Sequence, residues 1–260
     1  MDLIVLKLGG SVITRKSDDV LEVNEDNLRR LSNEIAEAMS EKQFRLFIVH
    51  GAGPFGHVLA KEYRLSDSHK DARQIKGFSL THQSMEALNS MVVATLLEAG
   101  LNAVSYQPSA AGVLKSGRID SMDLKPLKGM IDLGLIPVGY GDVLVDEDDG
   151  LNILSGDHLV PHVALGLKAS RVIIITDYNG VFAGDPGGSE KLDEITRENV
   201  DILDGRKTSG TDVTGGIRGK VMELLDLADE GVESEIISGN EKDYLKMALL
   251  GERGLGTIVK

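Results

Sequence analysis

Uninterrupted aliphatic runs that alternate with helix-forming segments dominate this sequence. Residues 3–8 (LIVLKL), 45–49 (RLFIV) and 171–176 (RVIIIT) have the length and composition of strands buried on both faces. Between the first two, residues 27–39 carry apolar side chains at helical spacing, and a second helical pattern runs from Met85 to Leu96. This order predicts an α/β fold, a three-layer sandwich whose central, mostly parallel sheet is covered by helices on both faces.

The remainder of the chain continues this alternation. One helical pattern opens at Ser155, and another follows Gly216 and closes at Gly231. Short strands are predicted at 103–106, 136–140, 234–237 and 257–259, and a polar hairpin at 143–145 and 151–154. No linker, low-complexity tract or internal repeat interrupts residues 1–260, so the sequence predicts a single domain.

Composition excludes several classes of function. The 260 residues contain no cysteine, which excludes disulfides, Cys-ligated zinc, iron–sulfur clusters and thiol nucleophiles. The formal charge is −13 and no run of Lys and Arg interrupts it, so nucleic acid and anionic membranes are not expected partners. The N-terminus enters a strand directly, and no stretch approaches the roughly 18 apolar residues of a membrane span. A cytoplasmic location is therefore expected.

The first predicted strand contains a lysine and ends in two glycines. A charged side chain inside an apolar strand, such as Lys7, is costly unless it has a partner or a ligand. Gly9 and Gly10 expose backbone N–H groups that can bind an anion, Ser11 follows them, and Lys16 lies on the loop beyond. The alternative is a strand-end lysine that reaches solvent past the glycines. Two lysines flanking a Gly-Gly turn favour a phosphate site.

The second predicted strand ends in the run His50–His57 (HGAGPFGH). Its glycines satisfy G-x-G-x-x-G, so a dinucleotide site has to be considered. However, the run does not follow the first strand, and no acidic residue ends a strand about 20 positions further on. The other interpretation is a phosphate nest at a helix N-terminus, with His57 one turn into the helix as a further donor.

Two acidic residues stand where strands end or helices begin. Asp157 opens a helical pattern, where either it or Ser155 could simply be an N-cap. The functional reading has Asp157 pointing into the site, where it would hold lysines in position. Asp177 follows the strand 171–176, and it either contacts a nucleotide or forms a turn with the Asn and Gly that come after it.

The segment 212–220 (DVTGGIRGK) combines glycines with a lysine before a helix. It lacks the full G-x-x-x-x-G-K-[ST] pattern, because Val221 follows Lys220. Gly216 and its neighbours nevertheless offer free N–H groups at the positive end of a helix dipole. The alternative is a flexible glycine-rich loop. Because ligands bind beyond the carboxyl ends of parallel strands, we expect these elements to share one edge of the sheet.

Taken in order, these motifs resemble the amino acid kinase superfamily, and in particular its isopentenyl phosphate kinase branch. The matching motifs are KLGGS (7–11), HGxGxFGH (50–57), QPS (107–109), GD (141–142), SGD (155–157), TDxxGV (176–181) and DVTGGxxxK (212–220). They span nearly the whole chain. His57 distinguishes the branch, since superfamily members that phosphorylate carboxylates or carbamate lack the F-G-H ending. A donor there suits an acceptor that brings its own phosphate dianion.

The resemblance implies an amino acid kinase-like fold with an acceptor-binding lobe (about 1–155) and a nucleotide-binding lobe (about 156–260). It also implies a homodimer that uses ATP with Mg²⁺ and takes isopentenyl phosphate or a similar small phosphorylated acceptor. Carried onto this sequence, the catalytic residues are Lys16, Lys7, Lys220 and Asp157. The acceptor site is Ala52, His57 and Gly156. The nucleotide site is Lys7, Gly9, Gly10, Ser11, Gly53, Asp177, Gly216 and Lys220, and no protein ligand to the metal is expected.

Two departures and several alternatives accompany this resemblance. Pro54 stands where a small residue with an N–H is expected, and Asn179 stands where Asp is more usual. Phe78, Met85 and Leu88 are candidates for the wall that surrounds the acceptor's tail. The alternative functions are a fosfomycin-kinase-like or amino acid kinase of the same superfamily, a non-catalytic ATP sensor, and an oxidoreductase that binds a dinucleotide.

Overall fold

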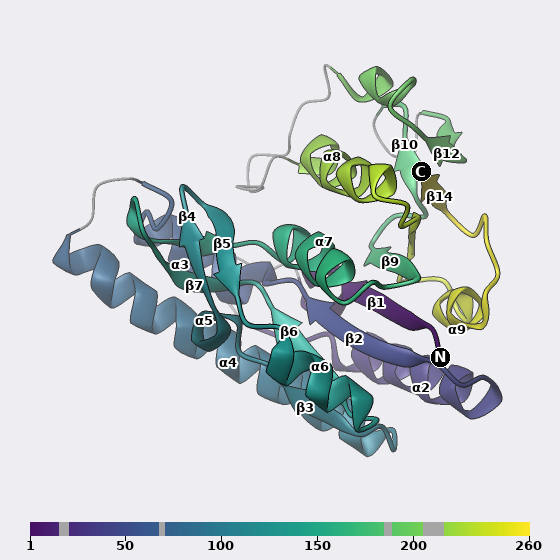
Figure 1. Ribbon diagram of the computed structural model, residues 1–260, viewed down its shortest axis with the longest axis horizontal. Helices are drawn as coiled ribbons and strands as arrows, with labels where there is room; N and C mark the ends of the chain where they lie inside the picture. The colour runs from purple at the N-terminus through teal and green to yellow at the C-terminus, as the bar shows by residue number, and fades with distance from the viewer. Residues whose placement is uncertain (16–20, 68–70, 185–188, 205–215) are drawn as a thin grey trace.

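An eight-stranded sheet forms the middle of the molecule in this computed structural model, which describes residues 1–15, 21–67, 71–184, 189–204 and 216–260 (Figure 1). The strand order is β12-β14-β13-β9-β1-β2-β6-β3. All neighbours pair in parallel except β13 and β14, which are antiparallel. The strands are β1 (Leu3–Leu8), β2 (Arg45–His50), β3 (Ala103–Ser105), β6 (Ile136–Tyr140), β9 (Arg171–Thr176), β12 (Glu194–Ile195), β13 (Ser234–Ser238) and β14 (Thr257–Val259).

Helices cover both faces of this sheet, and the alternation of side chains along β1 shows why. Ile4 and Leu6 point into one apolar cluster, and Leu3 and Val5 point into the other. In Figure 1, α2 and α4 lie on one side of β1 and β2, and α7 and α8 lie on the other. The helices that cover the first cluster are α1 (Gly10–Ile13), α2 (Glu25–Glu41), α3 (Gly53–Glu62), α4 (Ala72–Glu98) and α9 (Tyr244–Leu250). The helices that cover the second cluster are α6 (Lys125–Asp132), α7 (Gly156–Gly166), α8 (Gly216–Asp229) and the 3₁₀ helix η1 (Val200–Leu203). The predicted three-layer sandwich is confirmed.

A smaller, four-stranded sheet packs beside the main one, in the order β5-β4-β7-β8. Its antiparallel pair β7 (Asp142–Asp146) and β8 (Gly150–Leu154) is the predicted polar hairpin. The sequence did not predict β4 (Gly112–Lys115), which is short, or β5 (Arg118–Met122), which is short and largely exposed. The short helix α5 (Pro108–Ala111) leads into this sheet, and β10 (Val181–Phe182) pairs separately with β11 (Lys191–Leu192).

The buried carboxylate of Asp146 joins the two hairpins of the small sheet. Its Oδ2 accepts the N–H of Gly117 at 2.8 Å and its Oδ1 accepts the N–H of Ser116 at 3.1 Å, both in the β4–β5 turn. The same Oδ1 accepts the N–H groups of Asp148 and Asp149 in the β7–β8 turn. One side chain thus satisfies four backbone donors that the turns would otherwise leave without partners.

Helix α4 is longer than its apolar pattern indicated, because it begins at Ala72, well before Met85. A capping box explains this start: Asp71 accepts the N–H of Gln74 at 2.9 Å, and the Gln74 side chain accepts the N–H of Asp71 at 3.2 Å. The first half of α4 is polar, so hydrophobic periodicity could not reveal it. Although α4 is long, none of the described helices is sufficiently apolar over a sufficient length to cross a membrane.

Candidate active site

The glycine turns after β1 and β2 lie directly against each other at the carboxyl edge of the sheet. A Cβ atom on Gly10 would lie 2.4 Å from the nitrogen of Gly53, and one on Gly51 would lie 2.5 Å from the nitrogen of Gly10. Only glycine permits this approach of two backbones. The N–H of Gly9 donates to the carbonyl of Ile175 at 2.9 Å. This N–H therefore belongs to the sheet edge, whereas the sequence had suggested that it is exposed.

Residues from the ends of β1 and β9 also meet at this edge. The Ser11 hydroxyl donates to Oδ1 of Asp177 at 3.2 Å. Behind them, the Asn240 side-chain amide donates to the Asp177 carbonyl at 3.1 Å. The edge shared by the turns after β1, β2 and β9 thus forms as the parallel order predicts.

Two lysines meet one carboxylate beside these turns. Lys7 follows Val5 by two residues, so its side chain leaves β1 on the face covered by α7. Its Nζ lies 2.6 Å from Oδ1 of Asp157 in the first turn of α7. Nζ of Lys220, from α8, lies 3.2 Å from the same oxygen. Ser155 is the N-cap of α7, which leaves the Asp157 side chain for the lysines.

The electrostatics of this triad favour an anionic ligand. Burial, opposed by the charge of Asp157 and reinforced by that of Lys220, lowers the pKa of Lys7 to about 8. Burial alone would raise the pKa of Asp157, but Lys220 and Lys7 together hold it far below its usual range. With two cations and one anion, the triad carries a local positive charge within a protein of net charge −13. It is suited to bind phosphate.

The pKa of Lys7 predicts a specific pH profile. Because a lysine loses its charge as the pH rises through its pKa, the affinity of this site for phosphate should fall above about pH 8. A bound phosphate should in turn raise the pKa of Lys7. Calorimetric titration with inorganic phosphate between pH 6 and 10 tests this. Lys7→Arg, which stays charged, should lose the alkaline limb, and a profile of wild type that is flat to pH 10 would contradict the assignment.

The expected acceptor residues lie around the N-termini of α3 and α7. Ala52 is the N-cap residue of α3, and His57 follows in that helix, half-buried. A Cβ atom on Gly156 would lie 3.4 Å from Cε of Lys7, so this glycine lets α7 begin directly on the lysine side chain. Pro54 lies in the first turn of α3, where its missing N–H has no partner within the helix. This departure is therefore compatible with the local backbone.

Part of the predicted site falls outside the described residues. Lys16 does so, and so does the segment 205–215 that precedes α8. Gly216 is the first residue of α8 and has a φ of 65°. Within the described residues, the structure brings together Lys7, Asp157 and Lys220 and places Ser11 beside Asp177.

A polar cluster near the start of β7 was not predicted from the sequence. Nδ1 of His82, on α4, lies 2.9 Å from Oδ1 of the buried Asp142, and its Nε2 lies 2.9 Å from Nε2 of Gln107. Gln107 and Asp142 belong to the QPS and GD motifs, to which no role had been given. Nothing in the spacing of His82 along α4 connects it to them. The contact depends entirely on how α4 packs across β7.

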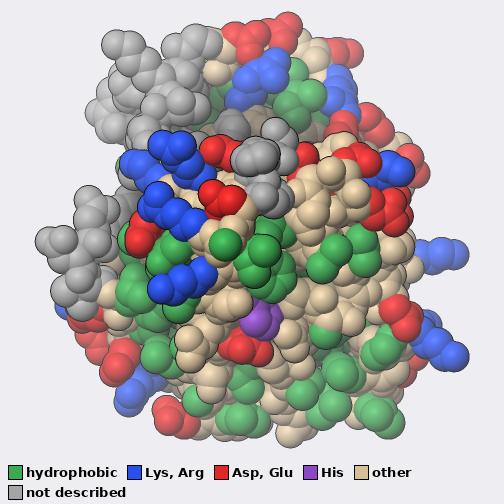
Figure 2. All heavy atoms as spheres, turned by 90° about the vertical axis from the view of Figure 1, so that its left-hand side faces the viewer, with side chains coloured by type: hydrophobic (Ala, Val, Ile, Leu, Met, Phe, Trp, Pro, Cys, Tyr) green, Lys and Arg blue, Asp and Glu red, His purple; other side chains and the backbone are tan. Residues whose placement is uncertain are grey.

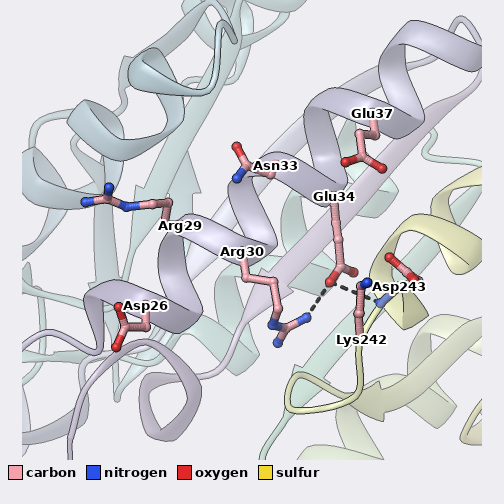
Figure 3. Close-up of a pocket in the computed structure, with 8 residues that line it drawn as sticks. All are labelled: Asp26, Arg29, Arg30, Asn33, Glu34, Glu37, Lys242 and Asp243. Carbon is pink, nitrogen blue, oxygen red and sulfur yellow. Dashed lines mark hydrogen bonds and ion pairs between the residues drawn. The ribbon is translucent and has the colours of Figure 1, made fainter.

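A hollow beside α2 is lined mostly by charged side chains, of which Arg30 and Glu34 already serve the fold (Figure 3). Glu34 accepts the N–H of Asp243 at 3.2 Å and the N–H of Leu245 at 3.1 Å, so it caps α9 from a neighbouring helix. Arg30 binds Glu34 and the carbonyl of Gly239. The lining residues are Asp26, Arg29, Arg30, Asn33, Glu34, Glu37, Lys242 and Asp243.

Figure 2 shows the end of the molecule toward which β2 points in Figure 1. Lys and Arg side chains gather in one part of this face, with acidic side chains beside them and hydrophobic side chains below.

The fold and this site define an α/β protein with two lysines on one buried carboxylate at the carboxyl edge of a parallel sheet, and comparison with known proteins specifies its family. Residues 2–238 match the amino acid kinase family. The isopentenyl phosphate kinase of Methanothermobacter thermautotrophicus is 44% identical over 98% of both chains, and that of Methanocaldococcus jannaschii is 33% identical over 96% of both. A solved isopentenyl phosphate kinase structure, 39% identical, matches with a TM-score of 0.87 over 99% of this chain and 100% of that one. The chain belongs to the amino acid kinase family, in its isopentenyl phosphate kinase branch.

Proposed function

We propose that this protein is a kinase that transfers the γ-phosphoryl group of ATP to isopentenyl phosphate. The product is isopentenyl diphosphate, an isoprenoid precursor made in this way by an alternative mevalonate route. The observation that carries the proposal is the buried triad of Lys7, Asp157 and Lys220 at the sheet edge, in a chain of the isopentenyl phosphate kinase branch.

The chemistry requires positioning and charge neutralisation more than covalent work by the protein. The second pKa of a phosphomonoester is about 6, so the attacking oxygen of the acceptor is already ionised near neutral pH. No general base is needed for in-line attack on the γ-phosphorus. The difficulty is to bring two polyanions together, and the net positive charge of Lys7, Asp157 and Lys220 offsets that repulsion.

We assign the nucleotide to the edge formed by β1, β9 and α8. Lys7 and Lys220 would bind its phosphates, and Asp157 would hold both ammonium groups in place. Lys16, outside the described residues, would stabilise the transferring phosphoryl group. The remaining nucleotide contacts are proposed for Gly9, Gly10, Ser11, Gly53, Asp177 and Gly216.

We assign the acceptor to the N-termini of α3 and α7. Ala52 and Gly156 lie at helix starts, where free N–H groups and the helix dipole favour a phosphate. His57 would donate to the phosphate that the acceptor already carries. For the tail, Phe78 is the better of the earlier candidates, because it packs against a small apolar cluster that includes Val143 and Leu151. Met85 and Leu88 are instead buried in the main core.

A magnesium ion would enter with the nucleotide and neutralise phosphate charge. Mg²⁺ is usually held by one or two carboxylates, waters and substrate phosphates. Asp177 and the Ser11 hydroxyl supply oxygen atoms of this kind at the nucleotide edge. No group of three or more His, Asp or Glu side chains suited to a metal occurs among the described residues. The oxygen atoms of Asp177 and Ser11 would supplement those of the phosphates.

The remaining expectations follow from the family resemblance. We propose a cytoplasmic homodimer with an acceptor-binding lobe (about 1–155) and a nucleotide-binding lobe (about 156–260). The turn after β1 and Gly53 would reach the nucleotide from the first lobe, and Gly156 would reach the acceptor from the second. The division falls at the start of α7, whose first turn supplies both Gly156 and Asp157.

An acceptor screen tests the proposed function. ADP release should be at least about 100-fold faster, in kcat/KM, with isopentenyl phosphate than with N-acetylglutamate, which has no phosphate for His57. It should also be faster than with fosfomycin, whose phosphonate can accept from His57 but which lacks the isopentenyl tail. Phosphorus NMR should show a diphosphate product. Preferential turnover of another acceptor would overturn the assignment in favour of a related kinase. If the protein binds ATP but releases no ADP with any acceptor, it is a non-catalytic ATP sensor. Binding of NADH would support the oxidoreductase alternative.

A further inference from the structure

An ion pair connects the small sheet to α8, the helix that carries Lys220. From β5, Arg118 donates through one guanidinium nitrogen to Oε1 of Glu223 at 2.5 Å and through the other to Oε2 at 3.1 Å. This two-pronged geometry is the strong, directional form of an arginine–carboxylate pair. Glu223 follows Lys220 by three residues, so both side chains lie on the same side of α8.

Helix α7 faces this side of α8 with two consecutive residues. Asp157 contacts Lys220, and Nε2 of the next residue, His158, lies 3.8 Å from Oε1 of Glu223. Burial and the nearby Arg118 lower the pKa of His158. His158 is therefore uncharged near neutral pH, and Arg118 is the cation that balances Glu223.

We propose that Arg118 and Glu223 are positioning residues for phosphoryl transfer, and that their ion pair holds the first turns of α8 so that Lys220 stays on Asp157. The proposal rests on the proposed function, because it concerns the same site. Buried residues of α8, such as Leu224 and Leu225, hold the helix on the core by hydrophobic packing. This packing is not directional, so it does not fix the orientation of the helix. A two-pronged ion pair instead fixes the rotation and height of the helix.

Small displacements matter at this position. The lysine side chain is a flexible four-carbon stem, so the place of its ammonium group depends on where the helix puts its Cα. A misplacement of about 1 Å in a catalytic constellation can lower a rate by about 10²-fold. Among the described ion pairs, Arg118 binds Glu223 while both lysines bind Asp157, so the effect of Arg118 and Glu223 on the rate is expected to pass through the position of Lys220.

The same helix supplies a matched control. Arg197 pairs with Asp226 and with Asp229, on the later turns of α8. Like Arg118, it is a partly exposed arginine that binds carboxylates of this helix from outside. Arg197→Gln should change stability little because its carboxylate partners are exposed, whereas Arg118→Gln should cost more because Glu223 is only 17% exposed. Of these two arginines, Arg118 is the one that binds the turn next to Lys220.

The test compares Arg118→Gln, Glu223→Gln and Arg197→Gln in the wild type and in a Lys220→Met background. In the wild type, Arg118→Gln and Glu223→Gln should each lower kcat about tenfold, whereas Arg197→Gln should change it less than about twofold. In the Lys220→Met background, the Arg118→Gln effect should shrink to less than about twofold, since residues that act through one another are not additive. Equal losses in both backgrounds, or an Arg197→Gln loss as large as that of Arg118→Gln, would overturn the proposal.

Calorimetric titration with Mg-ATP, without acceptor, separates this proposal from the proposed function. Arg118→Gln should raise the Kd for Mg-ATP about fivefold and Arg197→Gln should leave it unchanged. If the wild type fails to phosphorylate isopentenyl phosphate, the proposed function is wrong, and the Kd values alone decide the role of the ion pair. Similar Kd values for the two arginine variants would then reject it. Thermal unfolding of each variant verifies that it is folded.

Discussion

Asp157→Asn should lower kcat by about 10²- to 10³-fold, the range found when one preorganised charge-stabilising contact is removed from an active site. The carboxylate lies 2.6 Å from Nζ of Lys7 and 3.2 Å from Nζ of Lys220. Without it, two ammonium groups repel each other, and Lys7 stays buried without a counter-charge. Because Asp157 raises the pKa of Lys7, its loss should bring that pKa below about 8.

Steady-state kinetics with isopentenyl phosphate and ADP detection check this expectation. Asp146→Asn is the matched control, since Asp146 is also buried but binds only turn N–H groups of the small sheet among its described contacts. It should reduce stability and leave kcat of the folded enzyme within about twofold. The residual activity of Asp157→Asn should decline with rising pH earlier than that of the wild type. A kcat within tenfold of the wild type would show that the two lysines do not need this carboxylate.

The largest loss of stability is expected from Arg171→Met, at about 3–5 kcal/mol of unfolding free energy. Arg171 opens β9, is 7% exposed, and pairs with the buried Glu235 of β13. It also donates to the carbonyls of Ala248 at 2.7 Å and Glu252 at 3.1 Å. Removing the guanidinium would leave a buried carboxylate without its cation, which costs far more than losing an exposed ion pair.

Urea denaturation of single and double variants separates the value of the pair from the penalty of an unpaired charge. Arg171→Met combined with Glu235→Gln should be more stable than the single Arg171→Met variant, because no buried charge remains unpaired. A double variant less stable than both singles would refute this account. Since Arg171 lies at the amino end of β9, opposite the site, the folded fraction of each variant should keep the kcat of the wild type.

Much of the fold could be predicted from local sequence. The strands at 3–8 and 171–176 have the predicted bounds, and so does Thr257–Val259. Continuous aliphatic runs that end at glycine or polar residues leave little choice of conformation. The polar first half of α4 and the β4–β5 hairpin were missed, because short or exposed segments carry no hydrophobic period. A capping box at Asp71 was the one local signal that could have located the start of α4.

The sequence by itself determined which residue types are available for phosphate chemistry, namely a lysine in a buried strand and glycines at strand ends. Only the tertiary structure decided that Lys7 and Lys220, from opposite ends of the chain, share the carboxylate of Asp157. It alone also placed Arg118 on Glu223, beside Lys220. The physical reason is the distance along the chain over which each property is determined. Backbone conformation follows from neighbouring residues, whereas the charge state and position of a side chain depend on burial and on partners that long-range strand order and helix packing bring near.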